Sequence, residues 1–190
     1  MPFDSSAATR SAWIVFGLVW GAGAFTTKRT ARRQSAGSLI VHIGILGLAF
    51  DLLFSDLFRR GWLRERFVPE SDAIAWIGFA LTAAGIAFAI WARFNLGGNW
   101  SGTVTVKEGH TLVRTGPYRL VRHPIYTGLL LAALGSGIVA GEVRCLLALA
   151  LLVVEFKRKS LLEERFMIEQ FGAQYLDFRR EVKALIPSVW

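Results

Sequence analysis

The sequence predicts an all-α multi-pass membrane protein, and three features support this fold class: the composition, the apolar blocks and the distribution of cations. Hydrophobic residues make up 53% of the 190 residues, whereas charged residues make up only 19%. A soluble domain ordinarily carries about 25% charged residues. The apolar residues gather in blocks, for which we expect about five transmembrane helices: residues 12–25, 39–58, 73–92, 125–141 and 143–156.

These blocks differ in how well they match a bilayer, whose hydrocarbon core requires roughly 20 apolar residues in a helix. The 73–92 block meets this length without a charge, and the 39–58 block carries two acidic residues near one end. The others are shorter and depend on tilt or local thinning of the bilayer. The last two blocks meet at Gly141–Glu142 with no longer loop between them, which predicts a helical hairpin. Lys28 and Arg29 follow the first block, which we interpret as a retained helix and not a signal peptide.

The cations predict an orientation, because Lys and Arg accumulate in the cytoplasmic loops of membrane proteins. Most of the 22 Lys and Arg residues fall in 28–36, 95–123 and 157–190, which five spans would place on one side. We therefore expect these segments in the cytoplasm and the N-terminus outside. The arginines of 59–72 argue against this orientation, and we expect an interfacial helix there.

The formal net charge of +8 does not require a nucleic acid as partner. Membrane topology and anionic lipid headgroups account for it, and no basic stripe interleaved with aromatic residues occurs. We expect contact with membrane lipids, no nucleic acid and no obligate protein partner. Cys145 lies within an apolar run and is expected to be a buried small hydrophobic residue.

Histidines and glycines in the chain favour structural interpretations. His42, His110 and His123 have no metal-ligand spacing, so we expect no metal site. His42 lies in an apolar block and is expected to be an interhelical hydrogen-bond partner. Two glycine patterns inside apolar blocks predict close helix packing and not dinucleotide binding, because no strand precedes them: Gly17-x-x-x-Gly21 and Gly135-x-Gly137.

We expect one membrane domain over residues 1–190, with three helices in 1–93 and a catalytic half in 94–190. The polar segments 95–123 and 157–190 fall on the same predicted side, so they can build one site together. The first contains turns and a short extended piece around 103–106. The second has the apolar spacing of amphipathic helices, with a break at Gly172.

The polar segment RTGPYRLVRHPIYTG, residues 114–128, predicts a ligand site at the start of a helix. Pro124 suits the first helical turn, where free N–H groups attract a carboxylate or phosphate. Arg122 and His123 add positive charge, and Tyr118 and Tyr126 add aromatic walls. The alternative is an anchor at the membrane interface, where Arg and Tyr are common.

The tail supplies charged candidates for the same site. Glu163 and Glu164 are adjacent, so only one of them can face a given pocket on a helix. The alternative is a solvated helix face. Lys157, Arg158 and Lys159 follow the fifth block directly, and at least two of them are expected to be flanking charges of the membrane span.

Several linked motifs of the second half occur in a fixed order: His110-Thr-Leu-Val113, Gly116-Pro-Tyr118, Arg122-His-Pro-Ile-Tyr126-Thr-Gly128, Glu163-Glu164, Phe171-Gly172, Tyr175 and Ile186-Pro187. This set resembles the isoprenylcysteine carboxyl methyltransferase family, part of a wider group of integral-membrane methyltransferases that includes phospholipid N-methyltransferases. The resemblance covers roughly residues 94–187. The first three apolar blocks match only as apolar helices.

The resemblance implies S-adenosylmethionine as the methyl donor, bound at the cytoplasmic face. The cofactor contacts that it implies are His110, Thr111, Leu112, Val113, Tyr118, His123, Pro124, Ile125, Tyr126 and Glu163. It also implies a cation that faces the acceptor carboxylate, at the position of Lys159 with Arg158 beside it. The family has an arginine there, whereas lysine lacks the bidentate fork.

The resemblance therefore implies an integral-membrane enzyme that methylates a carboxylate of a lipophilic acceptor, as in C-terminal S-isoprenylcysteine. A carboxylate needs no general base, because it is ionised at neutral pH. The alternatives are a phospholipid or small amine or thiol methyltransferase of the same architecture, and a non-enzymatic membrane protein. A membrane sterol-type reductase is less favoured, because residues 124–129 lack the Asn and Asp of those enzymes.

Overall fold

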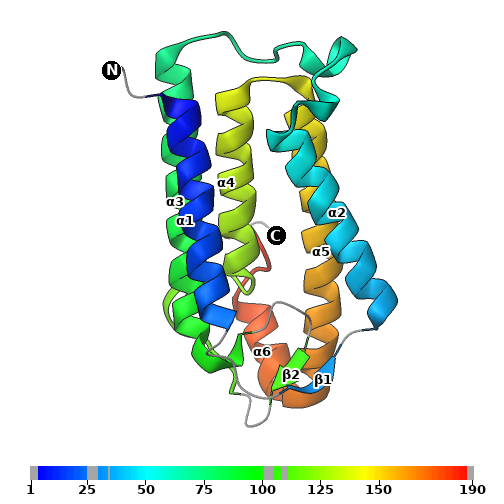
Figure 1. Cartoon of the computed structure of the whole chain (residues 1–190). Helices are drawn as coiled ribbons and strands as arrows, with labels where there is room; N and C mark the ends of the chain where they lie inside the picture. The colour runs from blue at the N-terminus through cyan, green and yellow to red at the C-terminus, as the bar shows by residue number, and fades with distance from the viewer. Residues whose placement is uncertain (1–3, 25–29, 34, 101–104, 108–110, 188–190) are drawn as a thin grey trace.

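The computed structural model describes residues 4–24, 30–33, 35–100, 105–107 and 111–187. Its regular structure is almost entirely helical, as predicted. The α-helices are α1 (Ser5–Ala24), α2 (Ala36–Phe54), α3 (Asp72–Leu96), α4 (Pro124–Ala140), α5 (Val143–Phe171) and α6 (Ala173–Glu181). Short 3-10 turns connect them: η1 (Asp56–Phe58), η2 (Gly61–Arg64), η3 (Gly97–Asn99) and η4 (Gly116–Arg119). Helices α1 to α5 stand side by side and run alternately down and up, with α6 at the lower end (Figure 1).

Two strands, which the sequence did not predict as a pair, join distant segments at this lower end. Strand β1 (Thr30–Arg33) pairs antiparallel with β2 (Thr105–Lys107), with Thr30 opposite Lys107 and Arg33 opposite Thr105. The extended piece expected around 103–106 is thus seen in part, since residues 103 and 104 lie outside the described residues. The pairing brings the segment after α1 against the segment after α3.

The last two apolar blocks form the predicted hairpin of α4 and α5. Helix α4 begins at Pro124, as expected, and its C-cap Gly141 has φ +70°, which favours glycine. The structure adds that the fifth block and the tail helix are one continuous helix, Val143–Phe171. Gly172, with φ +52°, then separates α5 from α6, at the predicted break.

Glycines bring α3 and α4 into very close contact. A Cβ added at Gly85 would lie 2.5 Å from the carbonyl oxygen of Gly128, and Gly78 faces Gly135 in the same way. The packing role predicted for Gly135 is therefore confirmed. The prediction is wrong for Gly17-x-x-x-Gly21, because no described atom lies within 4 Å of a Cβ built at either position.

Two of the described helical segments are long and apolar enough to cross a membrane: Ala36–Phe54, and Asp72–Asn99, which joins α3 and η3. Helix α4 is apolar but shorter. Only 22% and 28% of the two apolar windows is buried inside the protein, and Ile40 of α2 is 70% exposed. Such exposed apolar surfaces suit lipid. The number of five spans and their orientation stay predictions.

The upper end of the bundle contains the 55–71 loop and the turn between α4 and α5 (Figure 1). The prediction of an interfacial helix in this loop is wrong, because the loop forms the short turns η1 and η2 instead. Its arginines hold the hairpin turn instead. Arg59 Nε donates to Glu142 Oε1 at 2.7 Å, and Arg66 forms a backbone bridge with Glu142.

Candidate active site

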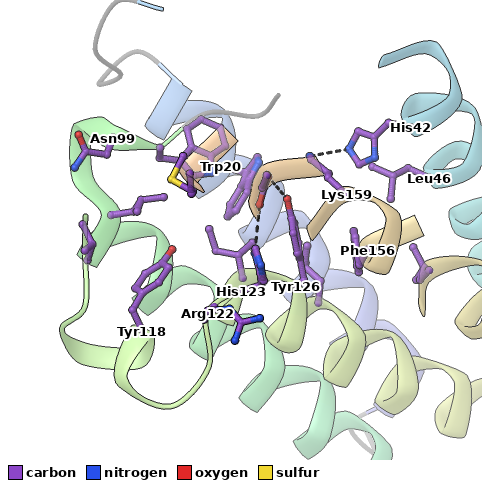
Figure 2. Close-up of a pocket in the computed structure, with 18 of the residues that line it drawn as sticks. Trp20, His42, Leu46, Asn99, Tyr118, Arg122, His123, Tyr126, Phe156 and Lys159 are labelled. Carbon is purple, nitrogen blue, oxygen red and sulfur yellow. Dashed lines mark hydrogen bonds and ion pairs between the residues drawn. The ribbon is translucent and has the colours of Figure 1, made fainter. Parts of the chain in front are cut away.

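A cavity of about 390 Å³ opens near the lower end of the bundle, and its volume suits a small molecule. Figure 2 shows part of its wall, with side chains from several elements pointing inward. The wall joins an aromatic and apolar side from α1 and α2 to polar side chains from α2, from α5, from the turns η3 and η4 and from the start of α4. The aromatic members from α1 and α2 are Trp13, Phe16, Trp20 and Phe50, and the polar members include His42, Asn99, Tyr118, His123, Lys159 and Glu163.

The C-terminal segment fixes the start of α4. The backbone N–H groups of Arg122 and His123 donate to the carbonyls of Lys183 and Ala184 at 2.8 and 3.0 Å. Thr127 Oγ1 donates to the carbonyl of Leu185 at 2.7 Å. The tail therefore occupies the N–H groups of the two residues before α4, and anion binding at the first turn of α4 stays a prediction.

Glu164 of α5 is buried, and its carboxylate bonds to residues of the segment just before α4. Arg122 donates to Glu164 Oε1 from Nη2 at 2.6 Å and from Nε at 3.0 Å. His123 Nε2 lies 3.2 Å from the same oxygen. Burial acts to raise the pKa of Glu164, but hydrogen bonds from His123 and Arg122 and their charges outweigh it and lower that pKa to about 2. Glu164 is thus a carboxylate that fixes Arg122 and His123.

Glu163 faces the cavity, so the two adjacent carboxylates have different surroundings, as the helix geometry predicts. The Tyr126 hydroxyl donates to Glu163 Oε1, and His123 Nδ1 lies 3.3 Å from Oε2. Burial acts to raise the pKa of Glu163, but the hydrogen bond and charge of His123 outweigh it and lower that pKa. The solvated helix face considered as the alternative is wrong for both glutamates: the Glu164 side chain is only 6% exposed, and the partly buried Glu163 side chain contacts Tyr126 and His123.

His123 lies between these two carboxylates, and its ring is one end of an aromatic stack. Burial acts to lower the pKa of His123, but hydrogen bonds to Glu163 and Glu164 outweigh it and raise that pKa. The rings of His123 and Tyr126 stack at 5.6 Å, and those of Tyr126 and Phe156 at 4.9 Å. The stack holds the Tyr126 ring in place, so that its hydroxyl donates to Glu163.

Lys159 lines the cavity one helical turn before Glu163 and is 6% exposed. Its Nζ lies 3.1 Å from Nε2 of His42 on α2. Arg158 points elsewhere: Nε and Nη2 contact the two oxygens of Glu155 at 2.8 and 2.7 Å, and Nη1 donates to Ser38 Oγ at 3.0 Å. Of the two cations proposed to hold an acceptor, the structure therefore brings Lys159 alone to the cavity wall.

The predicted cofactor residues before α4 are divided between the cavity and its surroundings. Leu112, Val113, Tyr118 and Ile125 line the cavity. Burial raises the pKa of Tyr118, so its hydroxyl stays protonated. Thr111 and Pro124 are not in the lining; Thr111 Oγ1 accepts from Asn99 Nδ2 at 3.0 Å, and Pro124 is buried at the first turn of α4. His110 lies outside the described residues.

Sequence reasoning missed the part of the lining that comes from α1, α2 and α6. Trp13, Phe16 and Trp20 were counted only as apolar residues, and Tyr175 was noted only as part of the resemblance. His42 was expected to be an interhelical hydrogen-bond partner, which its contact with Glu155 of α5 at 2.7 Å confirms. A histidine in an apolar block was the one signal that could have indicated this side of the cavity. Among the described residues, no group of three or more His, Cys, Asp or Glu could hold a metal ion.

Known proteins that resemble this chain are methyltransferases. Residues 73–174 match a family model described as phospholipid methyltransferase. The chain is 32% identical over 137 residues to protein-S-isoprenylcysteine O-methyltransferase of Rattus norvegicus, which covers 67% of this chain and 47% of the relative. The corresponding Homo sapiens protein is 30% identical over 133 residues, with the same coverage. An Arabidopsis thaliana relative, protein-S-isoprenylcysteine O-methyltransferase A, is 34% identical over 87 residues, 45% of this chain and 44% of the relative.

A solved structure supports the fold. It is that of a eukaryotic intramembrane Ras methyltransferase, isoprenylcysteine carboxyl methyltransferase, with a TM-score of 0.53 and 23% identity. The alignment covers 84% of this chain and 55% of the solved chain. The chain spans about half the length of the curated relatives that it matches. The resemblance inferred from the motifs is confirmed, and the matched range 73–174 contains Tyr118, His123, Tyr126, Lys159 and Glu163.

Proposed function

The chain belongs to the phospholipid methyltransferase family, and on this basis we propose that it is a membrane enzyme that methylates the carboxylate of a lipophilic acceptor. S-Isoprenylcysteine at a protein C-terminus is the acceptor class that the named relatives favour. One observation carries the proposal: Lys159 and Glu163 lie four residues apart on α5 and line the same cavity. This spacing places them on one helix face, so an acceptor cation site and a cofactor carboxylate are adjacent.

The cavity wall fits S-adenosylmethionine, which supplies a methyl group on a sulfonium when it is bound. Glu163 offers a carboxylate to a cationic or hydroxyl-bearing ligand, and Tyr126 and His123 fix its direction. Leu112 and Val113 offer an apolar wall, and Tyr118 adds an aromatic ring with a hydroxyl. We propose these residues for holding the cofactor.

Lys159 would hold the acceptor carboxylate and so align it for methyl transfer. The acceptor oxygen gains the methyl group and becomes a methyl ester, the sulfonium becomes a neutral thioether, and no proton has to move. Two opposite charges disappear in this reaction. Walls that exclude water favour such a step, because water stabilises the charged reactants more than the neutral products. The aromatic side of the cavity provides these walls.

The aromatic side also suits the lipophilic part of the acceptor. Trp13, Phe16 and Trp20 of α1 and Phe50 of α2 give an apolar surface. The same two helices also expose apolar side chains outward, since Leu18 of α1 is 69% exposed and Ile40 of α2 is 70% exposed. We propose that the acceptor enters from the bilayer. We also propose that the lower end of the bundle in Figure 1 lies in the cytoplasm, because most cations fall in the segments at that end.

A phospholipid amine is the second candidate acceptor, because the matching family model is described as phospholipid methyltransferase. The two candidates differ in the bond that they form. A methyl ester releases methanol in alkali, whereas a methylated amine does not. The acceptor can therefore be assigned by testing whether alkali releases the labelled methyl group.

The test uses purified protein in lipid vesicles, methyl-labelled S-adenosylmethionine, and either an N-acylated S-farnesylcysteine or phosphatidylethanolamine. We expect alkali-labile label on the farnesylcysteine. Titration with S-adenosylhomocysteine should show saturable binding that Glu163→Gln weakens at least tenfold. Glu169→Gln, a change at an exposed glutamate of the same helix, is the matched control and should bind normally. Folded wild-type protein that binds no S-adenosylhomocysteine would refute the proposal.

A further inference from the structure

We propose that His42 is a positioning residue, which fixes the ammonium group of Lys159 toward the acceptor carboxylate. The inference rests on the proposed function and adds a residue of α2, outside the range 73–174 that matches the family model. His42 and Lys159 both line the cavity. Figure 2 shows His42 and Leu46 on the α2 side, with Lys159 reaching across to His42.

The hydrogen-bond partners determine which nitrogen of His42 carries the proton. His42 Nδ1 lies 2.7 Å from Glu155 Oε1. A carboxylate accepts hydrogen bonds only, so Nδ1 must donate. Arg158 holds Glu155 in the ionised form through contacts of 2.8 and 2.7 Å to its two oxygens. In neutral His42, Nε2 is then an acceptor and faces outward from α2.

Lys159 is the donor to this acceptor. An ammonium group has three protons and no lone pair, so the 3.1 Å contact between Nζ and Nε2 is donated by Lys159. A doubly protonated His42 would instead present a proton to Nζ and repel it. The pair therefore keeps one positive charge, and that charge is on Lys159, at the cavity wall.

Other charged groups lie beside this cation. Arg158 and Glu155 neutralise one another beside His42, and His42 itself is neutral. Glu163, one turn along α5, is already engaged with Tyr126 and His123. An acceptor carboxylate that enters the cavity thus meets the ammonium group of Lys159, with Arg122 and His123 elsewhere in the same lining.

A lysine in this position requires such support more than an arginine would. Lysine is a point charge on a flexible four-carbon stem, and ordering that stem costs rotamer entropy. The bond to His42 fixes one ammonium proton, and Nζ lies 5.6 Å from the centre of the Tyr126 ring. Both contacts are made before the acceptor binds, so binding orders less of the side chain.

The experiment compares His42→Gln with His42→Met in vesicles, using the N-acylated S-farnesylcysteine as acceptor. The two side chains have similar length, but only the carboxamide oxygen of Gln can accept from Lys159. We expect His42→Met to raise the acceptor KM at least tenfold and His42→Gln to remain within about threefold of the wild type. The Kd for S-adenosylhomocysteine should stay within twofold in both variants, because the cofactor contacts proposed above are untouched.

A double-mutant cycle with Lys159→Met separates positioning from a general structural role. If His42 acts through Lys159, adding His42→Met to Lys159→Met should raise the acceptor KM less than twofold further. Thr82→Val is the matched control: it removes a buried hydroxyl whose hydrogen bonds to Gly78 and Ala132 lie outside the cavity lining. It should lower the unfolding midpoint without changing the acceptor KM.

An unchanged acceptor KM in folded His42→Met, or multiplicative losses in the cycle, would overturn the inference. Glu155→Gln gives a second route should His42→Met fail to fold. It removes the charge that holds the Nδ1 proton and is expected to raise the acceptor KM selectively; no such rise would also overturn the inference. A wild-type protein that methylates no prenylcysteine would refute the proposed function itself, which is seen before any variant is made.

Discussion

Glu163 and Glu164 show how neighbouring identical residues acquire different roles. Both are acidic side chains in the second half of α5, yet one faces the cavity and the other faces Arg122 and the tail. Successive helical positions are about 100° apart, so the sequence predicts that they differ. Which of the two faces the cavity came from the family resemblance. That Glu164 is buried and paired depends on Arg122, 42 residues away, which no local pattern shows.

The pairing of Glu164 predicts a pH dependence of stability. Its pKa in the folded protein is about 2, below the ordinary value of 4.5, so folding favours the carboxylate. The stabilisation is complete above about pH 4.5 and is lost as the pH falls toward 2. One pKa unit corresponds to 1.36 kcal/mol, so the contribution is on the order of 3 kcal/mol.

Thermal unfolding in detergent tests this prediction with Glu164→Gln, which cannot ionise. At pH 7 the variant should unfold at a lower temperature than the wild type. The gap between the two midpoints should narrow as the pH falls from about 4.5, because the wild type then loses its charge as well. A gap that stays constant down to pH 3 would show that the carboxylate does not contribute as described.

At the scale of helices, the contact between α3 and α4 depends on which glycines face one another. The sequence indicated close packing from Gly135, which was correct, and from Gly17 and Gly21, which was wrong. The physical reason is that a glycine pattern in one helix does not indicate which residues of another helix lie opposite it. Gly78 and Gly85 on α3 meet Gly135 and Gly128 on α4, and this matching of two helices becomes visible only when they are paired in space.

Gly85→Ala should therefore destabilise the protein. Its Cβ would lie 2.5 Å from the Gly128 carbonyl oxygen and from the Ala132 nitrogen, so the helices would have to move apart, which costs about 1–3 kcal/mol. Gly47→Ala in α2 is the matched control, because no described atom lies within 4 Å of its Cβ position. Alanine is the better helix former by roughly 0.5–1 kcal/mol, so this variant should be as stable as the wild type or more stable. The measurement is the unfolding midpoint in detergent, and equal midpoints for the two variants would contradict the packing argument.

For the molecule as a whole, the sequence predicted the helical architecture, the hairpin and the meeting of both polar segments at one end. It could not predict the closure of that end, where the backbone of residues 122 and 123 pairs with residues 183 and 184 and β1 pairs with β2. Backbone hydrogen bonds between distant segments have no side-chain signature. The same limit hid the partner of His42, because Glu155 lies 113 residues away on α5.

The orientation of the molecule is the last prediction, and it follows from the uneven distribution of Lys and Arg between the two ends. Glu70 lies in the upper loop and Gln174 in α6 at the lower end, and both are exposed. In intact cells, a membrane-impermeant thiol reagent should label Glu70→Cys and leave Gln174→Cys unlabelled until the membrane is opened. The native Cys145 is buried, and burial makes its thiol unreactive, so the wild type serves as the blank. The reverse labelling would place the cavity end outside, where a cytoplasmic methyl donor could not reach Glu163, and the proposed function would then fail together with the orientation.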